Sequence, residues 1–111
     1  MDNTTACIVM TSIGTEDEAE ALAAAIVEAQ LGACVQIQRV RSVYAWQGEL
    51  HREPEWVLHI KTLAARYAVL EAFIRERHSY QTPEIVQVPI TAGSADYLHW
   101  LAAGSAPLAQ E

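Results

Sequence analysis

Residues 33–49 read ACVQIQRVRSVYAWQGE, and this stretch decides the fold of a chain of 111 residues. Its first half alternates, so Val35 and Ile37 should face one side of a strand while Cys34 faces the other side with two glutamines. Its second half contains Gly48, and glycine readily takes the positive φ that a tight hairpin turn needs. We therefore predict a long strand, 33–44, that reverses at this glycine and carries a cysteine on its polar side.

The flanking segments predict the other elements of a single domain that spans residues 1–111. Residues 6–12 predict a first strand, and a capping box at Thr15 begins a helix that stops at Gly32. The remaining elements are predicted strands at 56–62 and 84–91, a helix at 63–77, a short helix capped by Ser94 and a frayed tail at 104–111.

The resulting β-α-β-β-α-β order is typical of an α+β, ferredoxin-like sandwich, here with an extra C-terminal helix. We expect an antiparallel sheet in the order four, one, three, two, with helices on one face only. For the uncovered face the sequence predicts Val9 or Cys7, Cys34, Gln36, Gln38, Val57, His59, Ile85 and Gln87. This set is too apolar for a bare surface and too polar for a sealed core, which predicts an oligomer interface.

Several reactive side chains are expected at one end of the sheet. We expect strands two and four to run the same way, so that Cys34, Lys61 and Glu84 share an end with His78 and Tyr80 of the preceding loop. Strands two and four are opposite edges, so Cys34 and Glu84 should lie about 14 Å apart. A metal bond to Cys or His spans only about 2.0–2.3 Å. Any site built from these residues is therefore predicted to be shared between subunits.

Composition argues against several classes of function. The formal net charge of −7 comes from seven basic and fourteen acidic residues, whereas phosphate recognition needs clustered Lys and Arg. The two cysteines cannot build a disulfide framework. No apolar run has signal-peptide or membrane-spanning length. We expect a cytoplasmic protein that binds neither nucleic acid nor membranes.

Five short motifs stand along the chain: ACVQI at 33–37, Ser42-x-Tyr44-x-Trp46-x-Gly48-Glu49, Lys61-Thr62, His78-x-Tyr80-x-x-Pro83-Glu84-Ile85 and Tyr97-Leu98-x-Trp100. Together, in this order and spacing, they resemble the CutA divalent-cation tolerance family. The resemblance implies a ferredoxin-like homotrimer, similar in architecture to PII signalling proteins. It also implies a link to copper tolerance and copper binding, with no established catalytic activity. Ser79 and Gln81 depart from the family pattern His-Pro-Tyr-Glu, and the second change removes an oxygen ligand.

The first hypothesis is a homotrimer that contributes to tolerance of divalent metal ions and binds copper(II) weakly at inter-subunit sites. Its candidate metal ligands are Cys34, His78 and Glu84, because thiolate and imidazole suit copper or zinc better than magnesium. No cofactor is required. Each ligand also has a structural explanation: a small buried hydrophobe for the cysteine, and a cation at a helix C-terminus for the histidine.

The second hypothesis is a PII-like sensor whose clefts between subunits hold a small anionic ligand, with Tyr44, Trp46, Lys61 and Tyr80 as cleft residues. The aromatic pair could instead pack at an interface, and the lysine could form a salt bridge. The third is a small enzyme with Cys34 as nucleophile and His78 as base. No Ser-His-Asp order or phosphate loop supports an enzyme independently, so we expect none.

Overall fold

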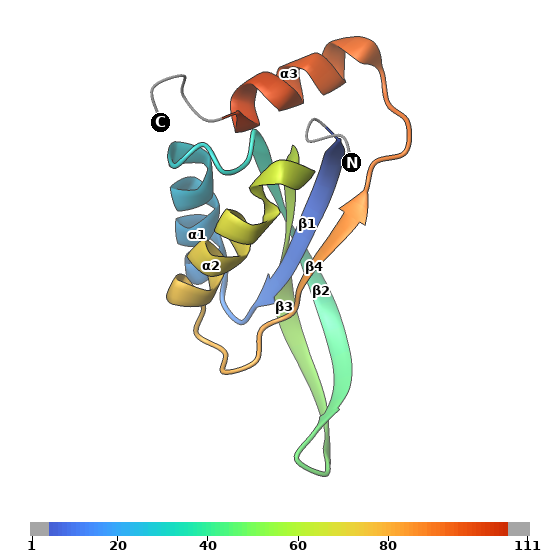
Figure 1. Cartoon of the computed structure of the whole chain (residues 1–111). Coiled ribbons are helices and arrows are strands. Elements are labelled where there is room, and N and C mark those ends of the chain that lie inside the picture. The colour runs from blue at the N-terminus through green and yellow to red at the C-terminus, as the bar shows by residue number, and fades with distance from the viewer. Residues whose placement is uncertain (1–4, 107–111) are drawn as a thin grey trace.

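A computed structural model describes residues 5–106 and shows a four-stranded antiparallel sheet with two helices on one face (Figure 1). The strands are β1 (Ala6–Ile13), β2 (Cys34–Trp46), β3 (Glu49–Leu63) and β4 (Ile85–Pro89). The helices are α1 (Glu16–Glu28), α2 (Tyr67–Arg77) and α3 (Ala95–Ser105), with a 3-10 turn η1 (Ala64–Arg66) before α2. The sheet order β2-β3-β1-β4 confirms the predicted order and the ferredoxin-like α+β class.

The core lies between the two central strands and the helices α1 and α2. Alternate residues of β1 and β3, among them Val9, Leu58 and Ile60, are fully buried. Helical residues meet them at spacings of three and four: Ala19, Leu22, Ala23 and Ile26 from α1, and Leu70 and Ile74 from α2. Residues two apart on the strands and three or four apart on the helices therefore form apolar faces that pack against one another in the core.

Helix α1 begins as predicted and ends earlier than predicted. Thr15 Oγ1 accepts from the Glu18 N–H at 3.2 Å, which satisfies one free donor of the first turn. The helix ends at Glu28, and the positive φ of 60° falls on Gln30. Gly32 serves a different purpose, because a Cβ there would lie 2.7 Å from Ile60 Cγ2. This glycine lets the chain approach the sheet closely.

Strands β2 and β3 form a hairpin that projects beyond the rest of the sheet (Figure 1). The predicted reversal is confirmed, with positive φ angles of 52° at Gln47 and 82° at Gly48. The prediction that the third strand begins at residue 56 is wrong, because β3 begins at Glu49. Residues 49–55 lack an apolar alternation, and backbone pairing with β2 keeps them extended. Pro54 is tolerated because β1 pairs with β3 only as far as Trp56.

Strand directions correct the sequence prediction. Strand β3 lies antiparallel between β1 and β2, so β1 and β2 run the same way, and β4 runs against both. The crossover through α1 requires this, because a strand-helix-strand unit returns the chain in its original direction. The start of β2 and the start of β4 therefore lie at opposite ends of the sheet, and the expected shared end is wrong.

The uncovered face also differs in part from prediction. Pairing places Cys34, Gln36, Gln38, Val57 and His59 on it, as expected. The expected Cys7, Val9, Ile85 and Gln87 instead fall on the helix side, where the first two are fully buried. Their neighbours Ile8, Met10, Val86 and Val88 take the uncovered positions. This face is therefore more apolar than the sequence predicted.

The C-terminal prediction is wrong where the structure describes the chain. Helix α3 continues to Ser105, whose hydroxyl donates to the Leu101 carbonyl at 2.8 Å, and both side chains are fully buried. The rest of the predicted frayed tail, 107–111, lies outside the described residues. Ser94 precedes the helix as expected, although no side-chain capping bond forms. Within residues 5–106 no helix is long and apolar enough to cross a membrane.

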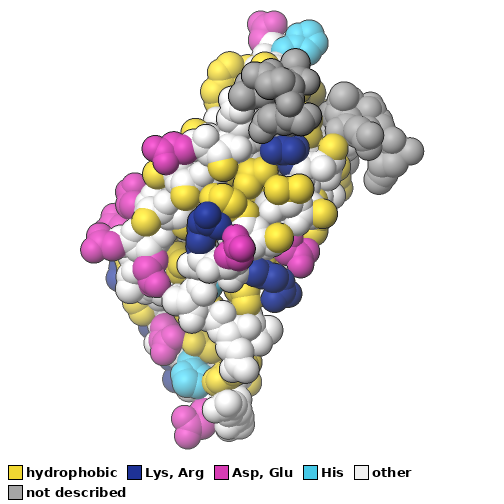
Figure 2. Space-filling view, turned by 60° about the vertical axis from the view of Figure 1, so that its left-hand side comes forward, with side chains coloured by type: hydrophobic (Ala, Val, Ile, Leu, Met, Phe, Trp, Pro, Cys, Tyr) yellow, Lys and Arg dark blue, Asp and Glu magenta, His cyan; other side chains and the backbone are white. Residues whose placement is uncertain are grey.

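The charged surface matches the composition. Figure 2 turns the helical side of the molecule forward and shows acidic side chains as separate spots spread down one flank. Lys and Arg side chains lie singly among hydrophobic ones on this face. The acidic side chains on this face follow the flank and do not gather into one patch.

Candidate functional site

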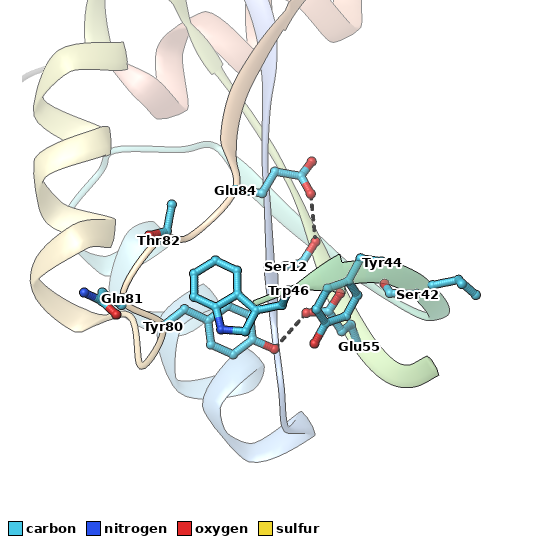
Figure 3. Close-up of a pocket in the computed structure, with 10 residues that line it drawn as sticks. Ser12, Ser42, Tyr44, Trp46, Glu55, Tyr80, Gln81, Thr82 and Glu84 are labelled. Atoms are coloured by element: carbon cyan, nitrogen blue, oxygen red, sulfur yellow. Dashed lines mark hydrogen bonds between the residues drawn. The ribbon is translucent and has the colours of Figure 1, made fainter. Parts of the chain in front are cut away.

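A cleft of about 620 Å³ lies between the β2–β3 hairpin and the loop that leads into β4 (Figure 3). Its main polar and aromatic lining residues are Ser12, Tyr44, Trp46, Glu55, Tyr80 and Glu84. They come from β1, β2, β3 and the loop, so sequence-distant segments build the site. Pairing and alternation put the strand residues on the uncovered side of the sheet.

Tyr80 and Glu55 form the innermost polar contact of the cleft. The Tyr80 hydroxyl donates to Glu55 Oε2 at 2.7 Å, and the Glu55 residue is only 8% exposed. Burial, followed by this hydrogen bond to a carboxylate, raises the pKa of Tyr80 well above its usual value. The phenol therefore stays protonated at neutral pH and donates a hydrogen bond to one carboxylate oxygen, while the other oxygen of Glu55 accepts nothing from Tyr80.

The outer wall of the cleft comes from the hairpin. The Tyr44 hydroxyl donates to Glu53 Oε1 at 2.7 Å, and its ring stacks on His51 with centroids 5.2 Å apart. The hydrogen bond to Glu53 raises the pKa of Tyr44. Trp46 lies two residues further along β2, on the same side of the strand, and its side chain is exposed. Tyr44 is therefore fixed in place by its hydrogen bond and ring contact, whereas Trp46 faces solvent.

His78 fixes the loop against β1. Its Nε2 lies 2.8 Å from the Ser12 carbonyl oxygen, and its Nδ1 accepts from the Tyr80 N–H at 3.0 Å. A carbonyl oxygen only accepts, so the proton sits on Nε2 and the ring is neutral. Both ring nitrogens are used within the chain. His78 is therefore a positioning residue for Tyr80 in this conformation.

Glu84 closes the other side of the cleft. The Ser12 hydroxyl donates to Glu84 Oε1 at 3.3 Å, so backbone and side chain of Ser12 each hold part of the loop. Figure 3 shows this contact and the Tyr80–Glu55 contact on the two sides of the space. The loop is thus tied to β1 and β3 near its start, through His78 and Tyr80, and to β1 at its end, through Glu84.

The structure brings together three of the four predicted cleft residues. Tyr44, Trp46 and Tyr80 line the same space. Lys61 does not, because its ammonium donates to Gln36 Oε1 at 2.6 Å at the far end of the sheet. Lys61 was predicted in the cleft because the strand directions were predicted wrongly. The described residues that line the cleft therefore lack the lysine that was expected to bind an anion.

The predicted metal ligands are separated within one chain. Cys34 pairs with Lys61, level with Ile8 on β1, whereas His78 and Glu84 both contact Ser12. Four residues of strand correspond to about 13 Å. Among residues 5–106 no three His, Cys, Asp or Glu side chains are grouped closely enough to hold a metal ion. The separation also rules out a Cys34–His78 nucleophile and base pair within one chain.

Cys7 and Cys34 are both free thiols with different surroundings. Cys7 is fully buried, and burial raises the pKa of its thiol. Cys34 is half-buried on the uncovered face, on edge strand β2. The polar side predicted for Cys34 is thus confirmed.

Glu55 and Ser12 line the candidate site, and the sequence analysis did not identify them. Glu55 lies in the charged run 49–55, which carries no alternation to mark its face. Its orientation depends on pairing with Val40 across the hairpin. Ser12 ends a strand and owes its role to the loop that folds back on it. Neither position carries a local signal in the sequence.

A family model described as CutA1 divalent ion tolerance protein matches residues 7–104. The chain belongs to this family. A curated CutA relative, the divalent-cation tolerance protein of Thermus thermophilus, is 38% identical over 95 residues, which cover 85% of this chain and 92% of that protein. The family predicted from the five motifs is thereby confirmed.

Solved CutA structures share the fold. CutA from Synechococcus elongatus superposes with a TM-score of 0.89 at 34% identity and covers 96% of this chain and 95% of its own. A CutA from Archaeoglobus fulgidus, described as periplasmic, gives a TM-score of 0.88 at 28% identity over 91% of this chain and 99% of its own. The fold is therefore shared with a CutA that is described as periplasmic, and the cytoplasmic location expected from the sequence stays a prediction.

Proposed function

We propose that this chain is a cytoplasmic, non-enzymatic homotrimer that contributes to divalent-cation tolerance and binds copper(II) weakly between subunits, with no required cofactor. The observation that carries the proposal is membership of the CutA1 family over residues 7–104. The curated relatives are named for tolerance of divalent cations.

The uncovered sheet face supports assembly. Ile8, Met10, Val86 and Val88 form an apolar surface there, which no helix within residues 5–106 covers. Exposed apolar surface of this kind is typical of subunit contacts.

Two matched substitutions test the assembly. Val88 on the uncovered face is 45% exposed and Val69 on α2 is 53% exposed, so Val88→Asp and Val69→Asp place the same charge at similarly exposed sites. Sedimentation equilibrium should show a trimer for the wild type and Val69→Asp, and dissociation for Val88→Asp. A monomeric wild type, or a trimer in both variants, would contradict the proposal that this face forms the contact.

The copper site is proposed across subunits. Cys34 supplies a half-buried thiol on the uncovered face, and His78 and Glu84 would have to come from a neighbouring subunit. His78 would also have to release one of its two hydrogen bonds. Weak binding is consistent with this requirement.

Copper titration of Cys34→Ala and His78→Ala tests the site, with His99→Ala as a control for an exposed histidine on α3. We expect Cys34→Ala to lose most of the affinity and the control to keep it. Unchanged affinity in both ligand variants would exclude copper binding at this site.

A second candidate is a PII-like small-ligand sensor, which the cleft specifically favours. Its volume of about 620 Å³ falls within the range of ligand pockets. A ligand that binds the native state must raise its stability. Thermal-shift measurements with small anions, cations and neutral compounds test this candidate, and a transition that no compound raises would argue against it.

A further inference from the structure

The charge of the cleft favours cations. Two carboxylates, Glu55 and Glu84, face it, and none of the described residues that line it is Lys or Arg. In the described part of the chain, no ion pair involves either carboxylate. Tyr80 and Ser12 each donate to one oxygen, and the carboxylates keep further acceptor positions. A cation entering the cleft would compensate this charge.

The aromatic walls narrow the class of cation. Tyr44, Trp46 and Tyr80 line the space around the two carboxylates (Figure 3). Aromatic faces attract ammonium groups through the ring quadrupole, and Trp is the strongest of the three types. The same rings offer apolar surface to the carbon skeleton of a ligand. Carboxylates and aromatic rings together recognise organic ammonium ions.

A metal ion fits the cleft less well. Two carboxylates with hydroxyl groups fall short of the three acidic, thiol or imidazole ligands that would mark a metal centre, and no such group is found in residues 5–106. The volume of about 620 Å³ exceeds what a bare ion needs and suits a molecule of several non-hydrogen atoms. The site therefore has the size, charge and wall chemistry for an organic ligand.

We propose that this cleft binds a small organic cation, with its ammonium group between Glu55 and Glu84 and its carbon skeleton against Trp46 and Tyr44. The inference rests on the second candidate function, the small-ligand sensor, and specifies its ligand class. It replaces the anion expected from the sequence, because the lysine behind that expectation lies at the other end of the sheet.

Choline and its neutral carbon isostere 3,3-dimethyl-1-butanol test the proposal on the protein as purified. The two compounds share shape and differ in charge. Calorimetric titration should show that choline binds about tenfold or more tightly than the isostere, a ratio within reach of ionic and cation–π contacts. Binding of choline should weaken with salt, because salt screens the attraction between the ammonium group and the carboxylates. 1,4-Diaminobutane is a second probe, with two ammonium groups for two carboxylates.

Matched glutamate variants locate the binding. Glu84→Gln removes one charge from the cleft and Glu20→Gln removes one from the exposed face of α1. We expect a loss of about tenfold in choline or diaminobutane affinity for Glu84→Gln and none for Glu20→Gln. Circular dichroism and sedimentation establish that both variants keep the fold and assembly.

Different failures have different meanings. If acetate or inorganic phosphate raises the thermal transition and neither cation does, the cation inference is wrong and the sensor candidate stands. If the cations bind equally to the wild type and Glu84→Gln, or no more tightly than the isostere, the inference is also wrong. If no compound of any charge binds, the sensor candidate fails with it. Copper titration is unaffected by each of these results and judges the first proposal separately.

Discussion

Replacing Tyr80 with phenylalanine removes one oxygen atom and the hydrogen bond at the bottom of the cleft. That hydroxyl donates over 2.7 Å to a carboxylate that is 8% exposed. Hydrogen bonds to charged groups contribute about 1.5–3 kcal/mol. Because the Tyr80 ring is itself half-buried and water can reach the site, we expect a loss near the lower limit, about 1.5 kcal/mol.

The pH dependence of Tyr80→Phe follows from the raised pKa of Tyr80. In the unfolded chain this phenol titrates near its reference value of about 10. The folded protein keeps the proton to higher pH, so the stabilisation is complete below pH about 10 and is lost as the pH rises through the folded pKa. Wild type should lose at most about 1.4 kcal/mol per pH unit from this group, and less where solvent screens it. The gap between wild type and Tyr80→Phe should therefore narrow above pH 10.

Urea unfolding at a fixed protein concentration, followed by circular dichroism at pH 7, 9, 10 and 11, measures both effects. Tyr97→Phe on α3 is the matched control, because no hydrogen bond of that hydroxyl occurs among the described residues. A Tyr80→Phe variant as stable as the control at pH 7 would refute the importance of the contact. A gap that stays constant between pH 9 and 11 would refute the protonation argument.

Two further substitutions test how the sequence sets the fold. Gly32→Ala should cost about 1–3 kcal/mol in unfolding free energy, because its Cβ would lie 2.7 Å from Ile60; Gly93→Ala, which meets only a flexible leucine, should cost less in the same denaturation assay. Thr15→Ala should cost about 0.5–2 kcal/mol by removing the acceptor for the Glu18 N–H, whereas Thr15→Ser should remain near wild type.

Local patterns in the sequence were sufficient for the elements and their order. The alternation at Val35 and Ile37 marked an edge strand, and Gly48 marked its reversal, both as found. The capping threonine at position 15 marked the start of α1. Each of these signals acts within a few residues, through side-chain period, turn geometry or capping. The features that they predict therefore depend little on the rest of the fold, and the structure contains them as predicted.

Long-range placement was the weaker part of the prediction. The strand order was right while the direction of β2 relative to β4 was wrong, and this single error moved Cys34 and Lys61 to the wrong end of the sheet. The residues of the uncovered face were also predicted wrongly in part. Ile85 and Val86 are both apolar, and only pairing with β1 determines which of them the helices cover. Residues such as Glu55 depend wholly on a partner strand, and local sequence contains no record of that partner.

The observed strand directions separate Cys34 from the acidic and aromatic side chains that the sequence analysis had placed beside it. Cys34 lies at one end of the sheet and the acidic, aromatic cleft at the other, about 13 Å away along β1. Within one chain, residues that far apart with no shared contacts usually act independently. Cys34→Ala should therefore leave choline affinity unchanged while it lowers copper affinity. Across subunits the two proposed sites would be coupled, because the copper ligands His78 and Glu84 of a neighbouring subunit also help to build the cleft of that subunit.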